Sequence, residues 1–309
     1  MKNHTQLDPD IANFAFALPL GILGLLAFGI SLHIVQKSPR YHNVFGILFI
    51  TYVSFHIQTT TVLTLWTLTR IIVRNMELTS FPWINFRRIS SPLANSTLYA
   101  AIWLQLILAI NRFCAISYPI IYPRIFNRRN AWMTVISLWS CSTLIAALYY
   151  NIECANYFET RIHSWSTLYG PCNHAFYAYI ATFLSDVIIF ISAVIDAIAF
   201  YRIITYLKAK ECRGNNAAQQ RCKHEIVFFK ETCVSTAIHA IFAAIFRIDI
   251  PVSRLTKITY VWLSILTLDG LAFVYFNHRV LTKQNAVGFH ISTMGLQTKT
   301  VRNDVNAAT

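Results

Sequence analysis

The side chains most able to do chemistry in this chain are ionisable groups set inside long apolar segments. Arg112, flanked by Asn111 and Phe113, closes the third of seven such segments, and Pro119 follows seven residues later. An Arg at a bilayer boundary is tolerated because its long side chain reaches the headgroups, and a Pro ends the helix just beyond it. Position alone therefore accounts for Arg112 as an interfacial side chain that contacts lipid phosphate.

Three carboxylates lie deeper in the apolar segments. Asp186 and Asp196 fall in the fifth segment and Asp269 in the seventh. A carboxylate inside a membrane is unfavourable unless it is protonated, paired or reached by water, so by default it marks a function. Asp196 and Asp269 lie toward the cytoplasmic halves, where hydrogen bonds between helices are the structural alternative, and Asp186 is the better ligand candidate. His56 and His239 could report pH or bind polar ligand groups, although core histidines satisfied by a neighbour are commoner.

Composition indicates which elements must position these groups. The chain of 309 residues is 55% apolar and 13% charged, with a mean hydropathy of +0.47, which is too hydrophobic for an ordinary soluble surface. Seven windows have the length of about 20 residues that crosses a hydrocarbon core of about 30 Å. Because lipid offers the backbone no hydrogen-bond partner, we expect each window to be a helix. The predicted spans are Ile11–Val35, Val44–Leu68, Leu93–Ile116, Ala131–Tyr149, Ala175–Ile203, Ile226–Phe246 and Ile258–Phe276.

The distribution of Lys and Arg predicts the orientation. With the N-terminus outside, 16 of the 26 basic residues lie on the cytoplasmic side and nine on the outer side, and such an excess marks the cytoplasm. We therefore predict an all-α seven-transmembrane helix bundle with the N-terminus outside and the C-terminus inside. Residues 1–10 form an extracellular tail, 11–278 the seven-span domain and 279–309 a cytoplasmic tail. The net charge of +13 matches anionic lipid of the inner leaflet, and no soluble basic domain exists to bind nucleic acid.

Two of the seven cysteines share the second outer loop. Cys154 and Cys172 enclose 17 residues and face an oxidising compartment in this orientation. A disulfide closing such a loop contributes on the order of 3 kcal/mol. We predict this local bridge; the alternative is a pair of free thiols.

Four stretches resemble one receptor family. In their order and spacing, the chain is similar to the nematode serpentine chemoreceptors of class x (Srx), within the rhodopsin-like G-protein-coupled receptors, from about residue 20 to about residue 280. The stretches are Phe45-Gly46-Ile47-Leu48, then Asn111-Arg112-Phe113 with Pro119, then Lys223-His224-Glu225-Ile226-Val227-Phe228-Phe229, and finally Leu268-Asp269-Gly270-Leu271 with Phe276-Asn277.

The resemblance implies a receptor for an environmental or endogenous chemical cue. It would bind a small molecule or a peptide and activate a heterotrimeric G protein. It would lie in the plasma membrane of a sensory neuron, surrounded by membrane lipid. The resemblance assigns G-protein coupling to Asn111, Arg112 and Phe113, and a switch or structural role to Asp269, Gly270 and Asn277. Ligand contacts would lie in the outer halves of the spans, where the candidates are Tyr99, Trp103, Tyr177, Asp186, His239 and Trp262.

The chain departs from the wider superfamily at several motifs. Span two has no Asp at its middle, so a sodium-type site is not expected, and span six lacks the Cys-Trp-x-Pro element. In span seven, Asp269-Gly270 replaces Asn-Pro; Gly can loosen a helix by removing packing and stiffness. Glu225 or Glu231 could pair with Arg112 in a resting state, with Lys230 as a competing partner.

Other chemistries find less support in the sequence. Ser, His and Asp are scattered over separate spans without a nucleophile elbow, so we do not expect an enzyme. We find no phosphate-binding loop and no spaced Cys/His cluster, and expect neither cofactor nor metal. Transporters usually show internal repeats and broken helices, and no convincing repeat is found here. A small-solute transporter or channel remains the alternative function, and it would carry solute or current instead of changing G-protein signalling.

Overall fold

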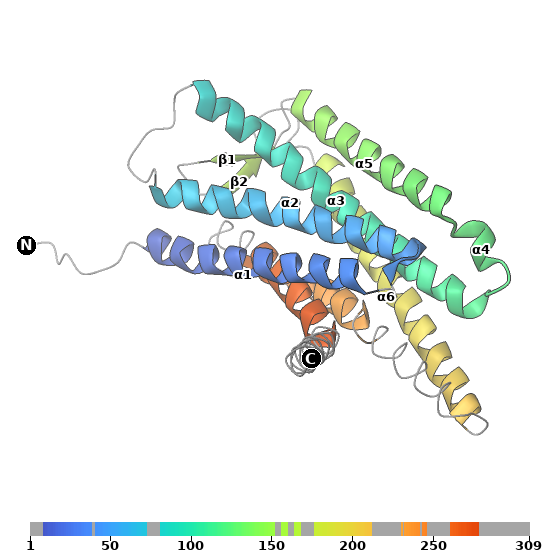
Figure 1. Ribbon diagram of the computed structural model, residues 1–309. Coiled ribbons are helices and arrows are strands. Elements are labelled where there is room, and N and C mark those ends of the chain that lie inside the picture. Colours follow the sequence, from blue (N-terminus) through green and yellow to red (C-terminus); the bar gives the residue numbers. More distant parts are fainter. Residues whose placement is uncertain are drawn as a thin grey trace, which may run out of the picture.

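The computed structural model is a bundle of long helices that alternate in direction (Figure 1). It describes residues 9–38, 41–72, 81–151, 156–159, 164–167, 176–211, 230, 232–241, 243–245 and 260–277. The labelled helices are α1 (Pro9–Lys37), α2 (Val44–Ile72), α3 (Phe81–Ser117), α4 (Tyr122–Ile125), α5 (Arg128–Asn151) and α6 (Phe176–Glu211). Two further helices lie at Thr232–Ile245 and Tyr260–Asn277.

The predicted helical membrane bundle is confirmed. Over the described residues, five helices are long and apolar enough to cross a membrane, and they match the first, second, third, fifth and seventh predicted spans. The fourth prediction lies within α5, and the sixth overlaps the Thr232–Ile245 helix. The ends differ: α3 begins 12 residues before the predicted Leu93, and α6 continues eight residues past Ile203.

Helix α3 is the centre of the bundle. It contacts α2, α5 and α6, while α2 also packs on α1. The principal apolar core lies among α1, α2, α3 and the Tyr260–Asn277 helix, and its fully buried members include Phe28, Leu48, Leu104 and Leu263. Large apolar side chains on the outward faces, such as Phe190 and Ile136, stay exposed, as expected of faces that contact lipid tails.

Glycines allow α1 to approach its neighbours closely. A Cβ at Gly21 would lie 2.2 Å from the Thr64 hydroxyl oxygen of α2, and one at Gly24 would lie 2.9 Å from the Thr267 hydroxyl oxygen. The Thr267 hydroxyl donates to the Leu20 carbonyl at 2.9 Å. Small residues are the usual means of close helix approach in membranes. The contact fixes the Tyr260–Asn277 helix against α1.

One described segment departs from the all-helical prediction. Strands β1 (Asn156–Glu159) and β2 (Ser164–Thr167) form an antiparallel hairpin in which Asn156 pairs with Thr167, and β1 contacts α3. This hairpin lies at the end of the bundle opposite α4 (Figure 1). Cys154 and Cys172 lie outside the described residues, two positions before β1 and five after β2, so their disulfide stays a prediction.

Candidate functional site

Arg112 is paired inside the bundle. Its guanidinium Nη2 donates to both carboxylate oxygens of Asp196 on α6, at 2.7 and 2.9 Å, and the Arg112 and Asp196 side chains are only 6% and 2% exposed. Charge-assisted bonds of this length are among the stronger hydrogen bonds in proteins. The snorkelling alternative is therefore wrong for this conformation, because the guanidinium points across the bundle and not toward headgroups.

Two neutral side chains complete the surroundings of this ion pair. The Thr236 hydroxyl, on the Thr232–Ile245 helix, donates to Asp196 at 2.7 Å. The Gln105 amide, two turns above Arg112 on α3, donates to the Thr236 oxygen at 3.3 Å. Polar contacts thus connect α3, α6 and the Thr232–Ile245 helix. The earlier suggestion of Glu225 or Glu231 as the partner of Arg112 falls on residues outside those described, and the partner observed is Asp196.

The second carboxylate, Asp269, is held by hydroxyl groups. One of its oxygens accepts a hydrogen bond from the Tyr52 hydroxyl of α2 at 3.0 Å, and the other accepts from Ser235. Ser235 and Thr236 are neighbours in the chain, so one turn of the Thr232–Ile245 helix contacts both buried carboxylates. Asp269 is 5% exposed. These two bonds connect Asp269 to α2 and to the Thr232–Ile245 helix; its role as a switch or structural residue stays a prediction.

Two buried histidines lie beside Asp269. The His56 Nε2 atom is 4.0 Å from an Asp269 carboxylate oxygen, and the His56 ring stacks on Phe28 with 5.4 Å between centroids. The His239 ring lies 5.9 Å from that of His56. The His239 Nδ1 atom is 2.9 Å from the Ser235 carbonyl oxygen, so His239 has a hydrogen-bond partner on its own helix.

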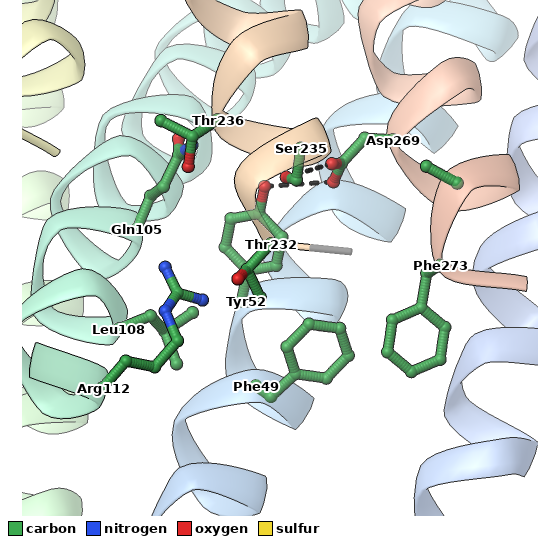
Figure 2. A pocket seen from close by; sticks show the side chains of 11 residues that line it. Phe49, Tyr52, Gln105, Leu108, Arg112, Thr232, Ser235, Thr236, Asp269 and Phe273 are labelled. Atoms are coloured by element: carbon green, nitrogen blue, oxygen red, sulfur yellow. Dashed lines mark hydrogen bonds between the residues drawn. The ribbon is translucent and has the colours of Figure 1, made fainter. Parts of the chain in front are cut away.

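A small cavity lies between Arg112 of the ion pair and Asp269 (Figure 2). It offers about 30 Å³ to water-sized molecules, enough to hold water where polar partners exist. Two buried polar atoms of its wall, Arg112 Nε and Gln105 Oε1, have no hydrogen-bond partner among the described residues. Figure 2 shows Arg112 and Asp269 on opposite sides of the cavity, with Tyr52 between them. The lining residues are Phe49, Tyr52, Gln105, Leu108, Arg112, Thr232, Ser235, Thr236, Asp269, Ala272 and Phe273.

The flanking residues Asn111 and Phe113 contact other elements. The Asn111 oxygen, buried at 2% exposure, accepts from the Tyr122 hydroxyl of α4 at 3.5 Å. The Phe113 ring lies under the Arg202 guanidinium of α6, 5.4 Å from the ring centroid. This end of α3 is therefore connected to α4 on one side and to α6 on the other.

In the Tyr260–Asn277 helix, Gly270 and Asn277 contact other parts of the bundle. The Asn277 oxygen accepts from the Tyr41 hydroxyl at 3.2 Å, and its amide donates to the Phe273 carbonyl at 2.9 Å. A Cβ at Gly270 would lie 3.0 Å from the Ala27 Cβ of α1. The absence of a side chain at Gly270 therefore allows close packing on α1, and its role as a switch stays a prediction.

The proposed ligand contacts are spread over several helices. Trp103, 36% exposed, lies on the surface of α3. Tyr99 and Asp186 are partly buried on α3 and α6, and Trp262 packs against the apolar core. Tyr177 lies in α6, with its side chain outside the description. His239 is buried beside His56. Of the five whose side chains are described, none lines the cavity of Figure 2.

Several residues of the site carry no warning in the sequence. Tyr52, Gln105, Ser235 and Thr236 are uncharged residues of apolar spans, and the charged groups of the site are Arg112, Asp196 and Asp269. The available signal is weak: Tyr52 lies one helical turn from His56, and Ser235 one turn from His239. Over the described residues, no group of three or more His, Cys, Asp or Glu side chains could hold a metal ion.

A bundle of membrane-length helices with its ionisable groups turned inward defines a multi-pass membrane protein with a polar interior. The chain belongs to the family described as "Serpentine type 7TM GPCR chemoreceptor Srx", whose model matches residues 18–277. That family is one of chemoreceptors related to G-protein-coupled receptors, so ligand and G protein are its general partners. No curated protein matches the sequence.

Proposed function

We propose that this protein is a plasma-membrane receptor of sensory neurons that binds a small chemical cue or a peptide and activates a heterotrimeric G protein. Membership of a chemoreceptor family supports the class. The observation that carries the coupling proposal is the burial of Arg112 against Asp196. The residue assigned to the G protein is held inside the bundle, so this conformation is a resting state.

Activation follows from what holds Arg112. The guanidinium is freed only when α3 and α6 separate or when Asp196 turns away, and Thr236 keeps Asp196 in place. A cue bound in the outer halves, by residues such as Tyr99, Trp103, Tyr177, Asp186 or Trp262, would act by moving the Thr232–Ile245 helix. Arg112 would then turn to the cytoplasm beside Asn111 and Phe113. In this proposal residues 1–10 lie outside the cell and residues 279–309 inside it.

The test compares two ways of changing the ion pair. Asp196→Asn keeps the shape and one oxygen acceptor but removes the charge that retains Arg112, so basal coupling should rise severalfold. The paired variant Arg112→Met with Asp196→Leu removes both charges with little change of volume, and it should reach the surface without coupling. Calcium and cAMP output without any added cue, divided by surface receptor, measures both.

Ser192→Ala is the matched control. Ser192 is buried on α6 one turn before Asp196, and its hydroxyl donates only to the Ile188 carbonyl of its own helix, at 2.7 Å, so basal output should not change. Unchanged basal output in Asp196→Asn, together with full coupling in the paired variant, would overturn the proposal. A current or solute flux through the wild-type protein, with no second-messenger response, would favour the transporter or channel instead.

A further inference from the structure

Among the described residues, the buried side chains include one more acid (Asp or Glu) than base (Arg or Lys). Among the described residues, the buried Asp and Arg side chains are Asp196, Asp269 and Arg112, and no buried Glu or Lys accompanies them. Arg112 and Asp196 neutralise each other as an ion pair. Asp269 receives only the neutral hydroxyls of Tyr52 and Ser235. An ionised carboxylate in a medium of low polarity is strongly unfavourable without a counter-charge, and such groups take up a proton instead.

His56, which lies next to Asp269, lacks hydrogen-bond partners. Both of its ring nitrogens are buried without a hydrogen-bond partner among the described residues, and the residue is 1% exposed. The ring is fixed by Phe28 on one face and by the edge-to-face contact with Tyr52, whose centroid is 4.2 Å away. In that position His56 Nε2 is 4.0 Å from the Asp269 oxygen that also accepts from Tyr52. Asp269, which has no cationic partner among the described residues, therefore lies next to the His56 imidazole, whose two nitrogens have no hydrogen-bond partner there.

The other described groups around Asp269 and His56 supply neither a cation to Asp269 nor a hydrogen-bond partner to His56. From α1 the neighbour is the apolar ring of Phe28. From α2 it is Tyr52, and from α3 it is Arg112, whose Nη2 is occupied by Asp196. From the Thr232–Ile245 helix come Ser235 and His239, and the Nδ1 atom of His239 is engaged by a backbone carbonyl. Among the described residues around Asp269, the imidazole nitrogens of His56 are the ones that are buried without a hydrogen-bond partner.

We propose that Asp269 and His56 together form a proton-binding site, in which one proton is shared between the carboxylate and His56 Nε2. The proton comes from water, and the net charge of the pair changes from −1 to 0. Nε2 and the carboxylate oxygen must approach from 4.0 Å to the distance of about 2.7–2.9 Å of a charge-assisted hydrogen bond. Because Ser235 donates to the same carboxylate, the proton is coupled to the position of the Thr232–Ile245 helix.

The experiment is infrared difference spectroscopy on the purified full-length protein in lipid nanodiscs, between about pH 5 and pH 8, the range in which histidines titrate. Wild type should show a protonated-carboxyl or imidazolium band that grows on acidification. Asp269→Asn keeps one oxygen acceptor, for Tyr52 or for Ser235, and His56→Gln keeps a polar side chain. The other histidines and carboxylates of the chain contribute bands of their own, so the band of the pair is the intensity that wild type has in excess of these, and that excess should be absent from both variants. His33→Gln is the control, because His33 is exposed on α1, and it should retain the band.

Each outcome decides the proposal. A band retained in His56→Gln but lost in Asp269→Asn would show that Asp269 takes the proton alone, which overturns the shared site. A band retained in both variants, or absent from wild type, overturns it as well. If His56→Gln does not fold, which elution from a size-exclusion column reveals, His56→Asn replaces it, because loss of the band in Asp269→Asn alone does not separate a shared proton from one held by Asp269. The readout requires no G protein, so it is independent of the proposed coupling.

Discussion

The two buried carboxylates of this receptor are stabilised in different ways. Asp196 has a formal counter-charge, since both of its oxygens accept from Arg112 and one also accepts from Thr236. Asp269 has hydroxyl donors from Tyr52 and Ser235 and an unpartnered imidazole nearby. Burial is similar, at 1% and 5% exposure. Two acids that are equally buried can therefore be stabilised by different interactions. Asp196 depends on the charge of Arg112, and Asp269 depends on hydrogen bonds from hydroxyl groups.

Replacing Asp196 of the ion pair should lower the stability of the protein more than any other single change considered. Asp196→Leu leaves Arg112 as a buried, unpaired cation, and such a loss usually destabilises by about 3–5 kcal/mol. The paired variant with Arg112→Met removes both charges and should recover most of that stability. The apparent melting temperature in detergent measures this. A paired variant no more stable than Asp196→Leu alone would show that the two side chains are not energetically coupled.

The same change at the second acid should be milder. Asp269→Leu leaves no unpaired cation and only deprives the Tyr52 and Ser235 hydroxyls of their acceptor, which we expect to lower stability by about 1–3 kcal/mol. Part of this is recovered because a Ser hydroxyl in a helix can turn to a carbonyl of its own helix. Melting of both Leu variants side by side checks the order. A greater loss for Asp269→Leu than for Asp196→Leu would reverse the comparison.

Removing a single hydroxyl donor should lower stability least, and the loss should be greater at Asp269 than at Asp196. Asp269 has only hydroxyl donors in the described structure, so Tyr52→Phe should lower stability by about 1–2 kcal/mol. Asp196 keeps both bonds from Arg112 when Thr236 is replaced by Val, so that variant should lose only about 0.5 kcal/mol. Ser31→Ala is a control for a buried hydroxyl that bonds only its own helix, to Ala27 at 2.8 Å. Equal losses for Tyr52→Phe and Thr236→Val would remove the distinction between the two acids.

The sequence predicts the bundle well because lipid imposes simple rules. Apolar length alone locates the helices, and the start of α2 at Val44 agrees with its prediction. The ends are less predictable, since α6 continues past its apolar part to Glu211, where backbone hydrogen bonds keep a polar segment helical. The hairpin of β1 and β2 also escaped prediction, because it lies in a loop between spans.

The site could be predicted only in part. Arg112 and Asp269 are conspicuous as charges in apolar runs, but the choice of Asp196 as partner depends on how α3 and α6 are rotated about their axes. That rotation is fixed by packing between residues 84 positions apart in the chain. Tyr52 and Ser235 have only the weak signal of lying one turn from a histidine, because a hydroxyl in a membrane helix more often bonds its own backbone, as Thr59 does with Phe55 at 3.0 Å.

The adjacency of Ser235 and Thr236 has a mechanical consequence. Neighbouring residues on a helix point about 100° apart, and here they reach carboxylates on two different helices. A turn of the Thr232–Ile245 helix about its own axis therefore disturbs both hydrogen bonds at once, whichever way it turns. Intermediate angles, with one bond intact and the other broken, are disfavoured for a rigid helix. The two bonds therefore hold one rotational setting of this helix together, and the helix leaves that setting only when both bonds break.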